Sequence, residues 1–355
     1  MQKYFLILLT IILSLTIIQC SSESENKKEN EKLDVSVKEF DSTDLPTTNI
    51  ELITENDNFS LTYNFREGDS FRYRLTTLSH SERSMKTDTT MSDIFDQKVI
   101  RIINFNTIAV ENDSITEIKC NVASISVEAN VNDEKITYQS GSVLDLAQAK
   151  RFIEHEGLIN NPFHFRITKN GEVLDVFEAD NVTDRYLELT GIKDSVKIEE
   201  KATFRNEIVN SLLRPLLGQI FRELPTQQLE IESTWDKVRD PSPVLVFNLQ
   251  YTNHYRVSDI DMLNEDRIAI INGFTTTTVE GETKHTKKGI NYVFQKPVSK
   301  ASGKIFFNLD KGMVQKSKTK TLIELSYTME MPSPQGVMKG VSSEVVANDN
   351  ILELL

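Results

Sequence analysis

The sequence predicts a mainly β protein of the α+β class, built as two antiparallel curved-sheet or half-barrel lobes with a helical segment between them. Three observations predict this class. Apolar and polar residues alternate over long stretches, turns rich in glycine separate these stretches, and a single long stretch has helical spacing instead. Alternation with a period of two gives a sheet one buried face and one solvated face.

The first predicted lobe covers residues 59–177. Its strand "FRYRLTT" alternates Phe71, Tyr73 and Leu75 with polar residues. In "SITEIKCNVASISVEANV" the apolar phase shifts near Ala123, and this shift predicts a β-bulge or sharp bend because a slip of one residue exchanges the two faces. Long strands with bends are typical of a strongly curved sheet or a partial barrel.

Glycine turns predict three further hairpins. Asn170 and Gly171 in "FHFRITKNGEVLDV" supply the positive φ that a tight hairpin needs. A similar turn ends at Gly312, and residues 332–336 separate the last two strands, so the second lobe is expected over 227–355. Each half runs from a polar turn and an aromatic residue to a glycine hairpin. An internal duplication explains this pattern, and so does the general similarity of antiparallel strands.

Residues 178–226 predict the helical connection. Pro215 is expected to kink the helix or to begin a second one, because proline lacks a backbone donor. The apolar stripe favours packing on a core over a role as a membrane or partner helix. A shorter helix is expected over 142–155. The stripe consists of residues at intervals of four: Phe204, Ile208, Leu212, Leu216, Ile220 and Leu224.

Residues 1–19 have the layout of a lipoprotein signal peptide that ends before Cys20. Lys3 precedes an uncharged apolar run of about 15 residues, which is shorter than a membrane span. The site resembles a bacterial lipobox, in which the cysteine thiol accepts a diacylglycerol. Gln19 departs from that motif, which has Gly, Ala or Ser there. An uncleaved anchor and a secreted soluble protein are the alternatives to lipidation of Cys20.

Residues 20–58 are predicted to form a disordered tether. Their Ser, Glu, Asn and Lys content buries too little apolar surface to offset the entropy of ordering. Ser21, in place of Asp after the lipidated cysteine, favours sorting to the outer membrane. We therefore expect a protein of the bacterial cell envelope whose partner is the membrane, held through an N-terminal lipid anchor of more than one acyl chain.

Charge and length limit the function classes. The chain has 355 residues and a net charge of −13, which disfavours nucleic acid and anionic lipid headgroups as broad partners. Removal of the signal and tether leaves about 300 residues, a size at which single cores divide. Cys120 is then the only remaining cysteine, and its place on an apolar strand face predicts a buried core residue.

Motifs for chemistry are missing from the sequence. The five histidines have no metal-binding spacing, and there is no nucleophile elbow, P-loop or dinucleotide fingerprint. We therefore expect no catalytic residue, no metal site and no cofactor. The alternative function is a hydrolase of envelope glycans, in which Asp236 and Asp240 lie near Trp235 and this tryptophan serves as a sugar platform. A second acidic cluster could hold calcium but lacks the EF-hand spacing: Asp259, Asp261, Glu265 and Asp266.

The favoured function is a non-catalytic envelope protein that binds an apolar ligand or a protein partner. Curved sheets with a helix across the opening are used by lipid carriers. Phe247, Leu249 and Tyr251 are candidates to line an apolar groove, although a filled core explains the same residues. A dry cavity of several hundred cubic ångströms would favour the carrier, and a packed interior would count against it.

Four segments together carry a family resemblance: "REGDSFRYRL", "FRITKNGEVLDVFEADNV", "RELPTQQLEIESTW" and "GKIFFNLDKGMVQKS". In this order they resemble an uncharacterised family of bacterial envelope lipoproteins, with a domain of unknown function, over most of residues 59–328. The resemblance implies an architecture and a location, and it implies no site.

Overall fold

The structure is a computed structural model that describes residues 45, 47–49, 58–112, 114–333 and 336–355. The chain divides into two compact units, of which the first, residues 1–43, lies outside the described residues. The strands are β1 (Thr48–Asn49), β2 (Ser70–Lys86), β3 (Thr90–Glu111), β4 (Ile115–Val131), β5 (Glu134–Gln139), β6 (Phe163–Thr168), β7 (Val173–Phe177), β8 (Thr234–Val238), β9 (Ser242–Val244), β10 (Phe247–Leu263), β11 (Asp266–Gly281), β12 (Lys284–Lys287), β13 (Ile290–Phe294), β14 (Val298–Asn308), β15 (Met313–Ser333) and β16 (Gly336–Leu354). The helices are α2 (Leu146–Arg151), α3 (Ile153–Glu156), α4 (Asp180–Thr190), α5 (Ile198–Ile208) and α6 (Arg214–Ile220), with a 3₁₀ turn at Lys193–Ser195 and a π-helical turn at Val209–Leu213.

Over the described residues the strands form one open sheet of 16 strands. Its central path runs β1-β10-β11-β14-β15-β16-β2-β3-β4-β6-β7, and every strand pair is antiparallel. The mainly β class is therefore confirmed.

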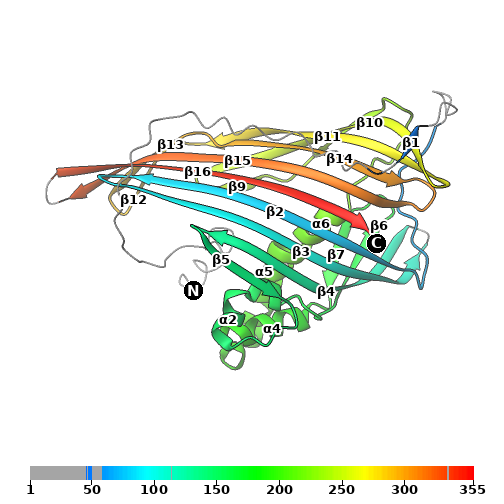
Figure 1. The fold of residues 1–355 in the computed structure, drawn as a ribbon, viewed down its shortest axis with the longest axis horizontal. Coiled ribbons are helices and arrows are strands. Elements are labelled where there is room, and N and C mark those ends of the chain that lie inside the picture. Colours follow the sequence, from blue (N-terminus) through cyan, green and yellow to red (C-terminus); the bar gives the residue numbers. More distant parts are fainter. Residues whose placement is uncertain (1–44, 46, 50–57, 113, 334–335) are drawn as a thin grey trace. The chain divides into compact units, whose positions relative to one another are not determined.

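The expected division of the sheet into two lobes is wrong. β16 pairs with β2 from Val341 and Lys86 to Leu354 and Tyr73, and this pairing joins the two strand-rich segments (Figure 1, red beside cyan). Two separate lobes would leave the edges of β2 and β16 without hydrogen-bond partners, which sheets avoid. The pairing gives no support to an internal duplication, which stays a prediction.

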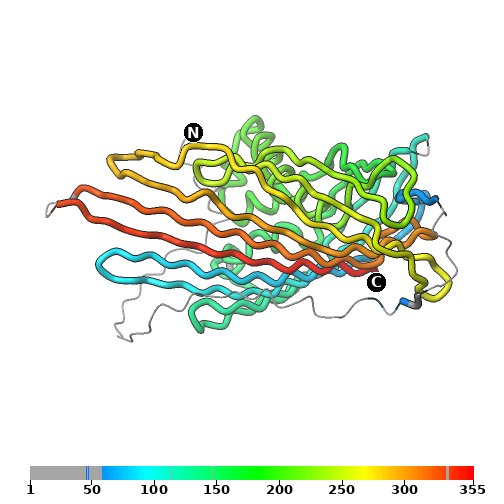
Figure 2. Tube along the Cα trace, turned by 90° about the horizontal axis from the view of Figure 1, so that it is seen from above, coloured from blue at the N-terminus to red at the C-terminus, as the bar shows by residue number. Residues whose placement is uncertain are grey.

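The helices that follow β7 cover one face of the sheet, which we call the helix-side face. Figures 1 and 2 show that the hairpin ends of β2–β3 and β15–β16 extend beyond these helices. Ile208, Leu216 and Ile220 are buried against the core, so the predicted apolar stripe packs on the sheet. No helix among the described residues has the length and apolarity needed to cross a membrane.

The predicted interruption at Pro215 is confirmed. A π-helical turn ends at Leu213, and α6 begins with Pro215 in its first turn. Proline is tolerated there because the first amides of a helix have no intrahelical acceptor. The second helix then ends at Ile220, and an extended segment follows it.

Local turn and bulge signals were also correct. Ile102 pairs with Ser124 and Ile103 pairs with Val122, so Ala123 is the extra residue of a bulge. Gly171 and Gly312 have φ of 86° and 63° in the turns that were predicted from them. β15 and β16 form the expected last hairpin. The helix expected over 142–155 is present as α2 and α3.

A group of aromatic rings fills the core between helices and sheet. Phe105 lies at its centre and is fully buried. Its ring centroid is 5.1 Å from that of Phe71, 5.4 Å from that of Phe221, and 6.2 Å from those of Tyr73 and Phe165. This interior is packed by side chains.

Candidate functional site

The register of the sheet arranges the helix-side face in rows that cross the strands. One row under the helices is buried and mainly apolar: Val257, Ile271, Ile305, Ser317, Leu352, Leu75, Arg101 and Ile125. The next row, which we call the boundary row, crosses ten strands: Trp235, Tyr255, Gly273, Gly303, Thr319, Asn350, Thr77, Val99, Val127 and Tyr138. Its middle carries small or polar side chains.

Farther from the helices the same face is first polar and then apolar. Asn253, Thr275, Thr321 and Asn348 belong to the polar row, and Thr275 donates a hydrogen bond to Asn253 over 2.8 Å. Beyond it lies a group that we call the distal apolar surface. This surface consists of Met85, Met91, Phe95, Ile323, Leu325 and Val346.

The distal apolar surface is partly open to solvent, and its Phe95 also packs against the main core. Met91 is 59% exposed, and its five companions are half-buried. One charged row crosses the surface, formed by Glu344, Arg83 and Asp93. Methionine side chains are flexible and polarisable, so they adapt to apolar partners of different shapes. The surface can therefore bind an apolar chain.

A short segment after α6 brings a cation to the boundary row. The backbone N–H of Arg222 donates to the Tyr63 hydroxyl over 2.8 Å, and Leu224 N–H donates to the Asn170 carbonyl over 2.7 Å. Gly171 lies against this segment so closely that a Cβ there would be 2.1 Å from the Arg222 carbonyl oxygen. The β6–β7 turn thus fixes the position of Arg222.

The Arg222 guanidinium donates to Thr319 Oγ1 over 3.2 Å and to the Gly218 carbonyl over 3.4 Å. No carboxylate among the described residues forms an ion pair with it, and its Nε is enclosed without an acceptor. Burial lowers the pKa of this guanidinium, and the nearby charge of Arg239 acts in the same direction. An arginine nevertheless stays charged in proteins.

β8 adds further donors beside Arg222. The Trp235 ring stacks on Tyr255 with centroids 5.2 Å apart, and its Nε1 is enclosed without an acceptor. Glu223 accepts from Lys237 Nζ over 2.6 Å and also pairs with Arg239. We call the group of Arg222, Lys237, Arg239 and Glu223 the cationic cluster, because it holds three cations and one carboxylate.

The geometry gives no support to a carboxylate pair beside Trp235. Asp236 points to the other face of β8, where its Oδ1 lies 2.8 Å from His254 Nδ1. Asp240 is exposed in the loop that follows. In the second acidic cluster, Asp261 accepts from Thr47 over 2.6 Å, and Asp266 pairs with Lys311 over 2.6 Å. The alternative function as a glycan hydrolase stays a prediction, and Asp236 and Asp240 do not converge beside Trp235.

No group of three or more potential metal ligands occurs in the part of the chain that the structure describes. The Asp259 carboxylate accepts a hydrogen bond from the Ile260 N–H over 2.8 Å. Glu265 lies in the tight turn between β10 and β11. His164 lies on the face of β6 opposite the buried Phe163 and Phe165, and its Nδ1 is 2.9 Å from Glu117.

Of the two interpretations of the apolar residues on β10, a groove or a filled core, the structure supports the filled core. Phe247 and Leu249 are buried in a small second core with Phe294, and Tyr251 packs against that core. β9, which pairs with β10, and β13, which pairs with β15, both contribute side chains to this second core. These residues stabilise the fold, and a ligand would have to bind elsewhere.

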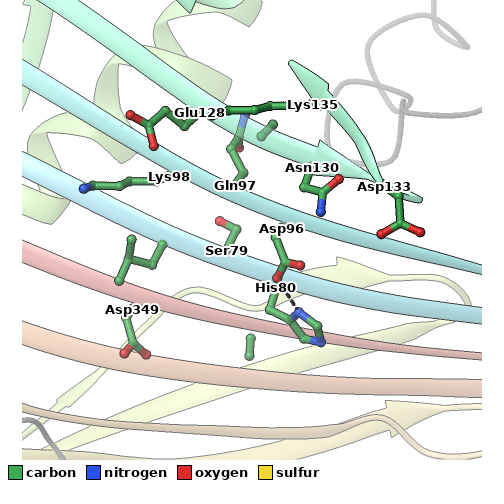
Figure 3. A pocket seen from close by; sticks show the side chains of 13 residues that line it. Ser79, His80, Asp96, Gln97, Lys98, Glu128, Asn130, Asp133, Lys135 and Asp349 are labelled. Atoms are coloured by element: carbon green, nitrogen blue, oxygen red, sulfur yellow. Dashed lines mark hydrogen bonds and ion pairs between the residues drawn. The ribbon is translucent and has the colours of Figure 1, made fainter. Parts of the chain in front are cut away.

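A depression of about 670 Å³ lies on the face opposite the helices (Figure 3). Its charged lining comes from β2 to β5 and β16: His80, Asp96, Lys98, Glu128, Asp133, Lys135 and Asp349. A dry apolar cavity was the expectation for a carrier, and this polar depression does not meet it. The packed interior around Phe105 also counts against a carrier with an enclosed cavity.

His80 in this depression predicts a dependence of stability on pH. Its Nδ1 lies 2.7 Å from Asp96 and its Nε2 lies 3.1 Å from Glu82. The Asp96 hydrogen bond raises the pKa of His80 above 6.5, partial burial opposes this, and Glu82 adds to the increase. The stabilisation is fully present below the pKa of the unfolded chain and is lost as pH rises through the folded pKa.

We expect His80→Gln to lower the free energy of unfolding more at pH 5 than at pH 8. Urea unfolding of both proteins at both pH values measures this difference. His285→Gln, at an exposed position of β12, is the control and should show no such dependence. An equal loss at both pH values for His80→Gln would contradict the assignment.

The structure describes one of the two cysteines, Cys120. Cys20 and its lipidation lie outside the described residues. Cys120 is fully buried on β4, as predicted, and burial raises the pKa of its thiol well above the usual range. A buried neutral thiol is unreactive.

Sequence reasoning missed Arg222. Its signal was the charged pair Arg222 and Glu223, which interrupts the apolar run "PLLGQIFRELP" at the end of the helical stripe. Trp235, Tyr255 and Thr319 come from three distant segments, and the strand pairing places them in one row, where Thr319 accepts from Arg222.

Three solved structures are distantly similar to this chain. Lipovitellin, from a structure titled for its lipid–protein interactions, is 10% identical with a TM-score of 0.42; the match covers 82% of this chain and 25% of that one. This chain therefore spans about a quarter of the lipovitellin chain. OccK2 (OpdF) of Pseudomonas aeruginosa is 7% identical with a TM-score of 0.17, covering 80% of this chain and 99% of that one.

A third solved structure, a DUF1329 family protein from Desulfovibrio piger, is 7% identical with a TM-score of 0.11; it covers 78% of this chain and 84% of that one. No curated protein matches. A family model described as a family of unknown function, DUF6263, matches residues 113–314. The expected domain of unknown function is thereby confirmed, while the lipoprotein part of the resemblance stays a prediction. Because this match spans more than half of the 355 residues, the chain belongs to the family of unknown function DUF6263.

Proposed function

We propose that this protein is a non-catalytic protein of the bacterial cell envelope that binds an apolar ligand on its distal apolar surface. In this proposal a lipid on Cys20 anchors the chain at the outer membrane. The apolar N-terminal run and Ser21 support this part of the proposal. The tether predicted over residues 20–58 links this anchor to the sheet, although Thr48 and Asn49 within that range pair with β10 as strand β1.

The observation that carries the proposal is the open half of the helix-side face. By strand register Met91 and Ile323 lie on the same side of the sheet as the core, and the hairpin ends of β2–β3 and β15–β16 extend beyond the helices (Figure 1). Exposed apolar area in water is unfavourable by about 25 cal/mol per Å², so a ligand with an apolar chain gains by covering it.

The first test is native mass spectrometry of the full chain purified from its native membrane. We expect a stoichiometric apolar ligand, and extraction into organic solvent should identify it. The intact mass of the same sample reports whether the chain begins at a diacylglycerol-modified Cys20. A sample that carries no ligand and that also fails to bind N-phenyl-1-naphthylamine, an uncharged apolar probe, would contradict the proposal and favour a protein partner.

A pair of neighbouring variants locates the ligand. Ile323→Gln should weaken binding of N-phenyl-1-naphthylamine by about tenfold, the effect of losing roughly 1.5 kcal/mol of apolar contact. Leu322→Gln is the matched control, because Leu322 is equally half-buried but points to the opposite face. Fluorescence titration measures both. Equal affinities of the two variants would place the ligand elsewhere.

A further inference from the structure

The cationic cluster lies where the helices end and the open face begins. Glu223 compensates Lys237 and Arg239, whereas Arg222 has no carboxylate partner among the described residues. A half-buried cation without a counter-ion is unfavourable because its charge is partly removed from water. The cluster therefore favours the arrival of an anion.

Two enclosed N–H groups strengthen this inference. Arg222 Nε and Trp235 Nε1 each lack an acceptor, although almost all buried donors in proteins have one. Tyr255 links the two residues: its ring stacks on Trp235, and its hydroxyl is close enough to influence the pKa of Arg222. Oxygen acceptors of a ligand that reaches this place would satisfy donors that the protein leaves unpaired.

We propose that the cationic cluster binds the anionic head of an amphiphile, a carboxylate or a phosphate, whose chain lies on the distal apolar surface. This inference rests on the proposed function and names its ligand class. The guanidinium of Arg222 presents paired donors that match the two oxygens of such a head.

The spacing along β15 fits one molecule. Thr319, which accepts from Arg222, and Leu325, on the distal apolar surface, lie on the same face of β15. The six residues from one to the other span about 20 Å of strand, comparable with an extended palmitate chain. Thr321 and Ile323 lie between them on that face, so the lining changes from polar to apolar along the path.

The test compares heads on one chain, using the delipidated full-length protein. Isothermal titration with palmitate, hexadecyl phosphate and hexadecanol measures the contribution of the anion. We expect the better of the two anions to bind at least about tenfold more tightly than the uncharged alcohol. Whichever anion is preferred identifies the head as a carboxylate or a phosphate. This comparison needs no variant.

Variants then assign the effect to Arg222. Arg222→Gln should remove the advantage of the anion over hexadecanol, and Arg222→Lys should restore part of it. Arg256→Gln is the control, because Arg256 follows Tyr255 on β10 but points to the opposite face. Equal affinities for all three amphiphiles would overturn this inference and leave the proposed function intact. Failure of all three amphiphiles and of N-phenyl-1-naphthylamine to bind would overturn both.

Discussion

Phe105→Ala is expected to lower the free energy of unfolding by about 3–5 kcal/mol. The Phe105 ring is fully buried and contacts four other aromatic rings from the sheet and from the segment after α6. Its removal loses the transfer energy of the ring, and the rigid neighbours cannot collapse into the space. Urea unfolding followed by fluorescence measures the change.

Phe274→Ala is the matched control for this substitution. Phe274 is also a phenylalanine within a long strand, but 57% of it is exposed on the opposite face. We expect a loss of no more than about 0.5 kcal/mol, as is usual for surface positions. Similar losses in the two variants would contradict the location of the core on the helix-side face.

Gly171→Ala is expected to cost roughly 2–5 kcal/mol, the sum of positive-φ strain and overpacking. Gly171 has a φ of 86°, and an added Cβ would lie 2.1 Å from the Arg222 carbonyl oxygen and 2.7 Å from the Tyr63 ring. Both contacting groups help to position Arg222, because the Tyr63 hydroxyl accepts from the Arg222 N–H. The variant should therefore be less stable and should also bind the anionic head less well.

Gly68→Ala separates the two causes. Gly68 has a φ of 85°, but nothing lies within 4 Å of an added Cβ. Its loss should be about 1–2 kcal/mol, from the backbone strain alone. Thermal unfolding of both variants, with titration of palmitate, measures the difference. If Gly68→Ala were as damaging as Gly171→Ala, the close approach of the turn to residue 222 would have no energetic role.

Local signals predicted much of this fold. Gly171 and Gly312 mark turns because their positive φ depends only on the residue itself. The apolar stripe through Ile208 and Leu216 and the phase shift at Ala123 are also local, since periodicity follows from neighbours in the chain. Each of these features can be recognised without knowledge of strand partners.

Strand order and the binding region could not be predicted in this way. The pairing of β2 with β16 depends on edges that lie far apart in the sequence, and both strands read equally well as edges of separate lobes. Phe247 is buried in a cluster with Phe294 of β13, a strand that pairs with β15 and not with β10. The role proposed for Arg222 depends on Trp235 and Thr319, which belong to strands far apart in the sequence.

The pairing of β2 with β16 also has a kinetic consequence. Arg74 and Glu353, which meet across this pair, are separated by 279 positions in the sequence. Contacts of such long range slow folding, because a large loop must close before they form. Until β16 is in place, β2 and β15 each have an open edge that can aggregate. The two halves of the sheet should therefore gain their stability in one late, cooperative step.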